Sequence, residues 1–206
     1  MQDELVQAEQ HLRVIREAVT KSKAIGNFAG ISAVYAGVAA IAGAVVQRLW
    51  VLPSPGSRHD FAFAVDWLVV VLAAVGFDYW HVLSRAEPER SLAVRLFRHS
   101  ARAAWPSLLF GITLTIAFLR EGRSDLVYPY WMLCYGSAVS AAALGGAKEL
   151  AWLGRAFLAC GAGLLLAQTF GPPQLVRAQL GLAAMIPTFG LLNIGYGILA
   201  GRRAGW

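Results

Sequence analysis

Runs of apolar residues, separated by short polar segments, recur along most of the chain. A helix needs about 20 apolar residues to cross the roughly 30 Å hydrocarbon core of a bilayer. Six runs have about this length, at residues 28–50, 61–83, 103–119, 126–147, 150–170 and 180–200. The connections are short, and those at 53–56 and 171–173 are rich in proline and glycine, which form turns. The pattern predicts an all-α membrane protein, with one bundle of six transmembrane helices over residues 28–206.

The first 27 residues have a different pattern, in which single apolar residues recur every three or four positions within a polar segment. These residues are Leu5, Ala8, Leu12, Ile15 and Val19. Such spacing is typical of a helix that packs one apolar face on another helix. We therefore predict a cytoplasmic amphipathic helix over residues 1–27 that runs on into the first apolar run.

Small residues continue this spacing into the first apolar run. They are Gly30, Ala33, Gly37, Ala40 and Ala44. In lipid, small residues allow two helices to approach closely. The two halves together predict a seam through which the chain binds a second copy of itself or a cytoplasmic protein. The alternative is that the seam packs on the chain's own cytoplasmic loops.

Residues 84–102, between the second and third apolar runs, form a basic segment. Pro88 and Glu89 predict the start of a helix, on which Arg95, Arg98 and Arg102 lie to one side and apolar residues to another. A basic amphipathic helix of this kind lies on a membrane surface and attracts anionic lipid headgroups. The alternative is that these arginines only fix the orientation of the chain in the membrane.

The composition supports a membrane protein over a soluble one. Hydrophobic residues make up 57% of the chain and charged residues 15%, whereas a soluble domain has about 45–50% and about 25%. The formal net charge of +6 would by itself suggest a nucleic-acid partner. The apolar runs argue against that partner and favour membrane lipid.

The distribution of lysine and arginine predicts the orientation. With the N-terminus in the cytoplasm, 13 of the 18 basic residues fall in cytoplasmic segments and five in external ones. This excess follows the positive-inside rule, and an even number of spans places both termini in the cytoplasm. Arginine also far outnumbers lysine, which is typical of GC-rich bacterial genomes. We predict a multi-pass protein of a bacterial inner membrane.

Three ionisable residues of the second apolar run are candidates for chemistry. Asp66, Asp78 and His81 fall on one helical face, with Asp66 towards the outer end and the other two near the inner end. Ionisable groups inside a membrane are costly and often line a proton or cation path. The alternative is structural, because residues near the ends of a span reach water.

Other polar residues in the runs predict contacts between helices. Arg155 either extends to the headgroups or pairs with Asp78 or Glu149 across helices. Asn193 shares a helical face with several glycines, so we expect it to form an interhelical hydrogen bond at a close contact.

Enzyme and metal motifs are absent from the sequence. The chain has no phosphate-binding loop, no dinucleotide fingerprint and no zinc-protease motif. Its four histidines and two cysteines do not cluster with carboxylates at metal-ligand spacing. We therefore predict no catalytic residue, no metal site and no cofactor.

Three short stretches carry a resemblance. They are the segment from Phe189 to Gly197 with the following Arg202 and Arg203, the segment from Pro129 to Gly136, and Ile15-Arg16-Glu17. Together they resemble a group of uncharacterised bacterial multi-pass membrane proteins that have a short cytoplasmic helix followed by about six spans. The group has a histidine where this chain has Asn193. The resemblance implies the architecture and no activity.

Two functions follow from these patterns. The first is a non-enzymatic membrane protein that acts by oligomerisation or by partner binding through its N-terminal helix. The alternative is a small channel or proton-coupled transporter that uses the acidic residues of the second span.

Overall fold

The computed structural model describes residues 30–51, 57–84, 89–143, 148–171 and 178–204, and the regular structure within them is entirely helical. The first helix, Gly30–Val51, ends in a π-helical turn, η1 (Gln47–Val51). It is followed by α2 (Ser57–Leu83), α3 (Glu89–Arg120), α4 (Ser124–Ala142) and α5 (Lys148–Phe170). The C-terminal helix is continuous from α6 (Ala178–Met185) through the π-helical η4 (Ile186–Leu192) to α7 (Asn193–Ala204).

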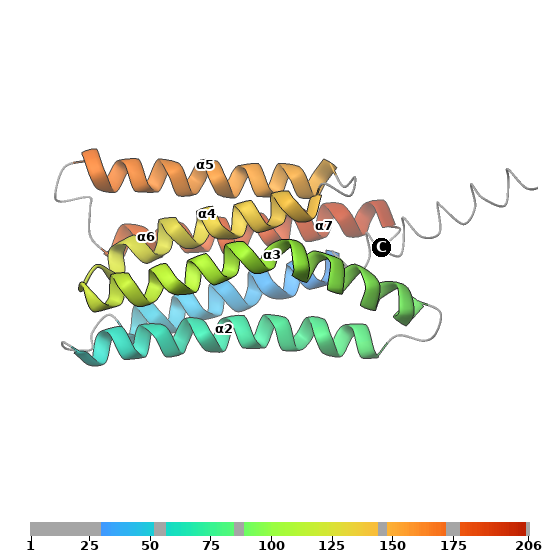
Figure 1. Ribbon diagram of the computed structural model, residues 1–206, viewed down its shortest axis with the longest axis horizontal. Coiled ribbons are helices and arrows are strands. Elements are labelled where there is room, and N and C mark those ends of the chain that lie inside the picture. The colour runs from blue at the N-terminus through green and yellow to red at the C-terminus, as the bar shows by residue number, and fades with distance from the viewer. Residues whose placement is uncertain (1–29, 52–56, 85–88, 144–147, 172–177, 205–206) are drawn as a thin grey trace, which may run out of the picture.

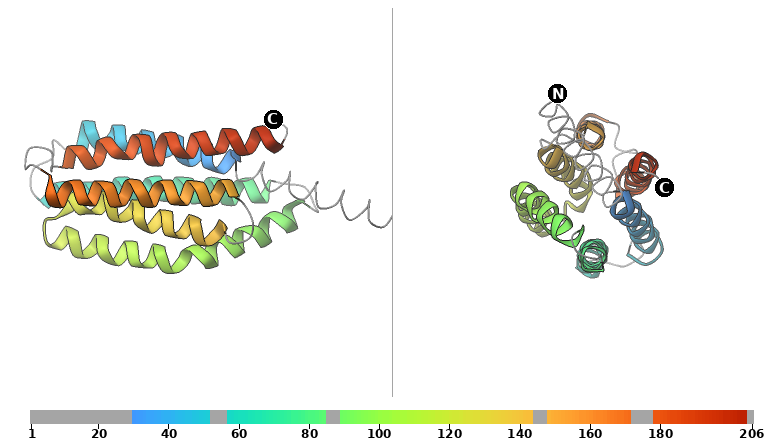
Figure 2. Two further views of the ribbon diagram at one scale, coloured as in Figure 1. Left: turned by 90° about the horizontal axis from the view of Figure 1, so that it is seen from above. Right: turned by 90° about the vertical axis from the view of Figure 1, so that its right-hand side faces the viewer.

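The helices form an elongated bundle in which they follow one another around the bundle axis in chain order (Figures 1 and 2). The first helix contacts α2, α2 contacts α3, and α4 packs most extensively of all, against α3 and α5. The C-terminal helix contacts α5 and returns beside the first helix. The C-terminus therefore lies at the same end of the bundle as the start of the first helix (Figure 1).

Five of the helices are long and apolar enough to cross a membrane, which indicates a membrane-embedded protein. They cover Gly30–Val51, Phe61–Leu83, Ala101–Arg120, Lys148–Phe170 and Leu180–Arg203. Many large apolar side chains on α2 and α3 point away from the bundle, among them Leu68, Leu72 and Phe110. Such a surface is unfavourable in water and favourable against lipid tails.

α4 differs from the other long helices because it is enclosed by protein. It is not among the five apolar spans, although it matches the predicted run at 126–147. Eight of its residues are buried, including Tyr128, Met132 and Cys134. Its Trp131 Nε1 donates a hydrogen bond of 2.8 Å to Thr115 Oγ1 of α3. α4 is therefore held by packing and polar contacts with its neighbours.

Glycines bring two helix pairs into close backbone contact. A Cβ atom on Gly37 would lie 2.6 Å from the carbonyl oxygen of Gly190, so the first helix and η4 touch through their backbones. A Cβ atom on Gly136 would lie 2.9 Å from the carbonyl oxygen of Gly154, which joins α4 to α5 in the same way. These contacts use the close approach that small residues allow in lipid.

A tight turn connects α3 to α4. Gly122 has a φ of 68°, a left-handed conformation that glycine adopts without steric cost. Gly122 N donates to Leu119 O at 3.2 Å, and Arg123 N donates to Phe118 O at 2.8 Å. This pair of bonds is a Schellman motif, which satisfies the last carbonyl groups of α3 and turns the chain directly into α4.

The basic segment before the third span is helical, as predicted, and belongs to the same helix as that span. α3 begins at Glu89, where the sequence predicted a helix start, and continues without interruption to Arg120. Pro106 lies within it, with its side chain exposed. The segment 89–102 is therefore the first part of a helix of 32 residues. The predicted helix over residues 1–27 lies wholly outside the described residues.

Candidate functional site

A chain of hydrogen bonds crosses the interior of the bundle near the end of the first helix. Trp67 Nε1 of α2 donates to Gln47 Oε1 at 2.7 Å, and Gln47 Nε2 donates to Tyr128 Oη of α4 at 2.6 Å. The Gln47 side chain is completely buried, and Tyr128 is 2% exposed. The buried amide of Gln47 thus joins the first helix to α2 and to α4.

The direction of these bonds follows from chemistry. An indole nitrogen can only donate, so the Gln47 oxygen must face Trp67 and the Gln47 amide nitrogen must face Tyr128. The Tyr128 oxygen therefore accepts from Gln47, and its own proton is left for another acceptor. The described residues supply no hydrogen bond for that proton.

Asp66, the residue before Trp67, brings a carboxylate to the same region. Its Oδ2 atom is buried and has no hydrogen-bond partner among the described residues. A Cβ atom on Gly43, one turn before Gln47, would lie 3.9 Å from this oxygen and would collide with Val70. The carboxyl group is also within electrostatic range of Tyr128. The unpartnered Asp66 oxygen, an acceptor, and the Tyr128 hydroxyl, a donor, thus occupy one region of the bundle interior.

The Tyr128 ring is fixed from two sides. Phe63 of α2 meets it edge to face, with the ring centroids 5.6 Å apart. Gly181 of α6 lies directly against the ring, so closely that a Cβ atom there would collide with it. This packing orients the hydroxyl group towards Gln47.

A second polar region lies towards the other end of α2. Asp78 lies beside Ser32 of the first helix, whose buried hydroxyl forms no hydrogen bond within the described residues. Asp66 and Asp78 therefore both face the first helix, at Gly43 and Ser32 respectively. Twelve residues separate the two carboxylates, which corresponds to about 18 Å along the helix. His81, the third predicted residue, stacks on Phe77 of its own helix at 5.7 Å.

Asn193 forms the interhelical hydrogen bond that its position in the sequence suggested. Its Oδ1 accepts from Tyr135 Oη of α4 at 3.1 Å, and its Nδ2 donates to Phe189 O at 2.9 Å. Phe157 and Phe189 surround the Tyr135 ring, with ring centroids 4.7 and 5.1 Å from it. A π-helical segment disrupts the regular backbone bonding just before Asn193, and the side-chain amide supplies a partner for one of its carbonyl groups.

Of the two predicted arrangements of Arg155, the pairing with Glu149 is not the one that the structure shows. Glu149 forms an ion pair with Arg203 of α7, while Arg155 lies exposed on α5. The ion pair joins the start of α5 to the end of the C-terminal helix. Arg155 and Asp78 are not joined by an ion pair in the part of the chain that the structure describes.

The small-residue half of the predicted seam is occupied within the chain. Gly37 lies against Gly190 and Ile194, and the carbonyl oxygen of Gly30 lies against Gly197. Ala40 and Ala44 are 4% and 1% exposed. Because the C-terminal helix covers Gly30 and Gly37, these two glycines contact their own chain rather than a second copy or a partner. The other half of the seam, from Leu5 to Val19, lies outside the described residues.

The sequence missed Gln47, Tyr128 and Trp67. Gln47 is a polar residue within an apolar run, but the charged Arg48 beside it suggested the end of a span. Trp67 lies within an apolar run, where nothing in the sequence shows that its indole points into the bundle. A glutamine next to a helix end gives no information about a tyrosine 81 positions away.

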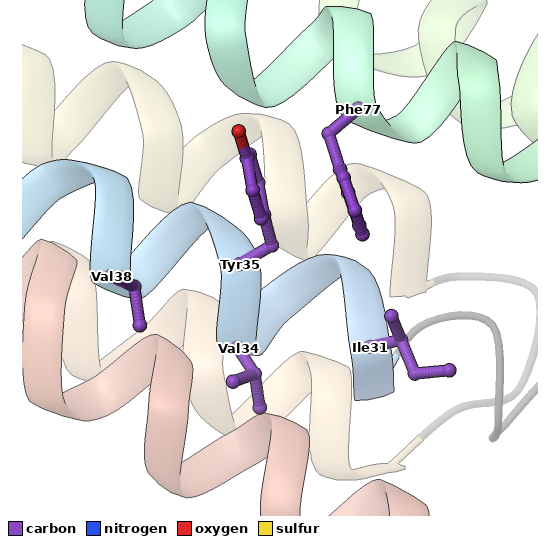
Figure 3. A pocket seen from close by; sticks show the side chains of 5 residues that line it. All are labelled: Ile31, Val34, Tyr35, Val38 and Phe77. Atoms are coloured by element: carbon purple, nitrogen blue, oxygen red, sulfur yellow. The ribbon is translucent and has the colours of Figure 1, made fainter.

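An apolar groove of about 290 Å³ opens on the surface between the first helix and α2 (Figure 3). Tyr35 and Phe77 point towards each other across the two helices and stack with ring centroids 3.8 Å apart. Ile31, Val34 and Val38 complete its lining. The groove includes neither carboxylate, so it is separate from the polar regions.

Comparison of the chain with protein-family models, with curated proteins and with solved structures finds no match.

Proposed function

We propose that the protein is a six-span protein of a bacterial inner membrane, with both termini in the cytoplasm, that moves protons as a channel or a proton-coupled transporter. Asp66 is the proton-binding group in this proposal. The observation that carries it is the buried Asp66 Oδ2, which has no hydrogen-bond partner among the described residues. A buried carboxylate oxygen without a partner disfavours the ionised form and so favours the uptake of a proton.

The surroundings of Asp66 favour a proton over a metal cation. A cation such as Ca²⁺ takes about six to eight oxygen ligands. Near Asp66, the oxygens of Gln47 and Tyr128 already accept hydrogen bonds. No group of three or more histidine, cysteine or acidic side chains within the described residues is arranged to hold a metal. A proton needs only one oxygen and no cavity.

Asp78 gives the proposal a second proton-binding position. It lies on the same helix, about 18 Å from Asp66 towards the end that holds the C-terminus. Proton relays in membrane proteins are often built from several ionisable groups at different depths. The two carboxylates supply these groups along the boundary between α2 and the first helix.

α2 has few buried contacts that would resist its movement. Its spanning segment is 6% buried, as is that of α3, against 33% for the first helix, and α2 contacts only its two neighbours to any extent. Few buried contacts correspond to a low free-energy cost of displacement. A small movement of α2 would expose Asp66 to water without disturbing the contacts between α4 and α5.

Proton flux into liposomes tests the proposal. The purified full chain is reconstituted with a pH-sensitive dye inside the vesicles, and a potassium diffusion potential drives proton entry. We expect flux with the wild type and a loss of flux to the level of protein-free vesicles with Asp66→Asn. Asp125→Asn is the matched control, because Asp125 lies at the start of α4 and pairs with Arg123.

Two results would overturn the proposal. One is a wild-type flux equal to that of protein-free vesicles, under a potential of either sign and across a range of pH. The other is a flux through Asp66→Asn equal to that of the wild type and of Asp125→Asn. Size-exclusion profiles and helical content, compared among the three proteins, separate a lost function from a lost fold.

A further inference from the structure

The first part of α3 extends beyond the rest of the bundle. α3 has 32 residues and is about 48 Å long, whereas its apolar segment covers only Ala101–Arg120. The twelve residues before Ala101 add about 18 Å of helix. Figure 1 shows this part of α3 projecting past the neighbouring helices, at the end that holds the C-terminus.

Three exposed arginines form a stripe along this projection. Arg95, Arg98 and Arg102 are separated by three and four residues, which places them within about 60° of arc on the helix surface. The stripe rises about 10 Å along the helix, because each residue adds about 1.5 Å. We call these three residues the arginine stripe.

Among the described residues, no acidic side chain pairs with the arginine stripe. Within the described ranges, Glu149 pairs with Arg203 and Asp125 pairs with Arg123, while the three arginines of the stripe have no ion pair. Their guanidinium groups therefore lie along one line, exposed and without an acidic partner among the described residues.

The depth of the stripe identifies the anion. Arg102 lies at the edge of the apolar segment, and Arg95 lies about 10 Å beyond it. The headgroup layer on each side of a bilayer is about 5–7 Å thick. The stripe therefore crosses the layer in which lipid phosphate groups lie. A guanidinium group binds a phosphate with two parallel hydrogen bonds, which a lysine ammonium cannot do.

We propose that the arginine stripe of α3 is a binding site for the headgroups of anionic phospholipids in the leaflet at the C-terminal end of the bundle. The continuity of α3 is central to this proposal. Because one rigid helix carries both the stripe and the apolar segment, the membrane itself sets the height of the three arginines. The site requires an anionic lipid, since a zwitterionic headgroup carries its own ammonium group close to the phosphate.

Lipid binding to the detergent-solubilised full chain tests the proposal. The protein is titrated with phosphatidylglycerol, and the bound lipids are counted by native mass spectrometry. The variant R95Q/R98Q/R102Q removes the stripe. The control R48Q/R120Q/R123Q removes three exposed arginines from the opposite end of the bundle, so the change in net charge is the same. Phosphatidylcholine is the neutral lipid for comparison.

Each basic residue near a membrane surface contributes about 1 kcal/mol, so we expect phosphatidylglycerol binding to weaken about fivefold for each arginine removed from the stripe. The control should bind as the wild type does, and phosphatidylcholine should bind weakly to all three proteins. The proposal is overturned if the stripe variant binds like the wild type, if the control loses as much lipid, or if phosphatidylcholine binds equally well. Helical content confirms that each variant is folded.

Discussion

Gly37 of the first helix and Gly190 of η4 lie so close together that a methyl group on Gly37 would come within 2.6 Å of the Gly190 carbonyl oxygen. This distance is shorter than any ordinary contact between a side chain and a backbone. The two helices are about 150 residues apart in the sequence, and their contact closes the bundle.

Gly37→Ala should therefore destabilise the protein. Forcing extra atoms into a packed contact typically costs about 1–3 kcal/mol. The thermal midpoint of unfolding in detergent measures the effect. Gly76→Ala is the matched control, because a Cβ atom on Gly76 meets nothing within 4 Å. The packing argument fails if the two variants have the same midpoint.

Tyr128→Phe should destabilise the bundle by removing one oxygen atom. The buried Gln47 amide would lose its acceptor, and an unsatisfied buried polar group costs about 1–3 kcal/mol. The free energy of unfolding, measured by chemical denaturation in a fixed detergent, reports the loss. Tyr79→Phe removes the same atom from a side chain that is 57% exposed, and it should have little effect. Equal losses in both variants would contradict the role of the network.

Tyr135 and Asn193 should show coupled energies. Tyr135→Phe and Asn193→Leu each remove one side of the hydrogen bond between α4 and the C-terminal helix. Groups that share a hydrogen bond typically couple by about 0.5–3 kcal/mol in a double-mutant cycle. We expect Asn193→Leu to be the more severe change, because Phe189 O also loses its side-chain donor. Strictly additive losses would show that the bond does not contribute.

The ion pair between Glu149 and Arg203 should contribute little by itself. Both side chains are well exposed, at 39% and 70%, and exposed pairs contribute about 0–1 kcal/mol. Glu149→Gln should therefore shift the thermal midpoint only slightly, and added salt should reduce that shift further. A large shift that salt does not change would mean that the pair has a structural role beyond its charges.

The positions of the helices could be predicted from the sequence because each depends on local composition. The predicted run at 61–83 lies within α2, and the run at 150–170 lies within α5. The predicted run at 103–119 covers only part of α3, because the hydrophobicity pattern divides the apolar residues from the basic residues before them. In the structure both groups lie on one continuous helix from Glu89 to Arg120.

The partners of the polar residues could not be predicted in the same way. Periodicity placed Asp66 and Asp78 on one face of a helix, but it could not show that Gly43 and Ser32 of the first helix lie opposite them. Asn193 was identified as a hydrogen-bonding residue, while its partner Tyr135 was not. A partner depends on which helices are neighbours, and that information is distributed over the whole chain.

The central place of α4 has a consequence for how the protein is made. Its polar side chains reach Thr115 of α3, Gln47 of the first helix and Asn193 of the C-terminal helix. Only a three-residue connection separates α3 from α4, so we expect the translocation machinery to receive the two as a hairpin. The hydroxyl of Tyr135 then has no hydrogen-bond acceptor until Asn193, 58 residues further along the chain, has been inserted. A nascent chain therefore holds an unsatisfied hydroxyl group inside the bilayer until the helix that carries Asn193 has been synthesised.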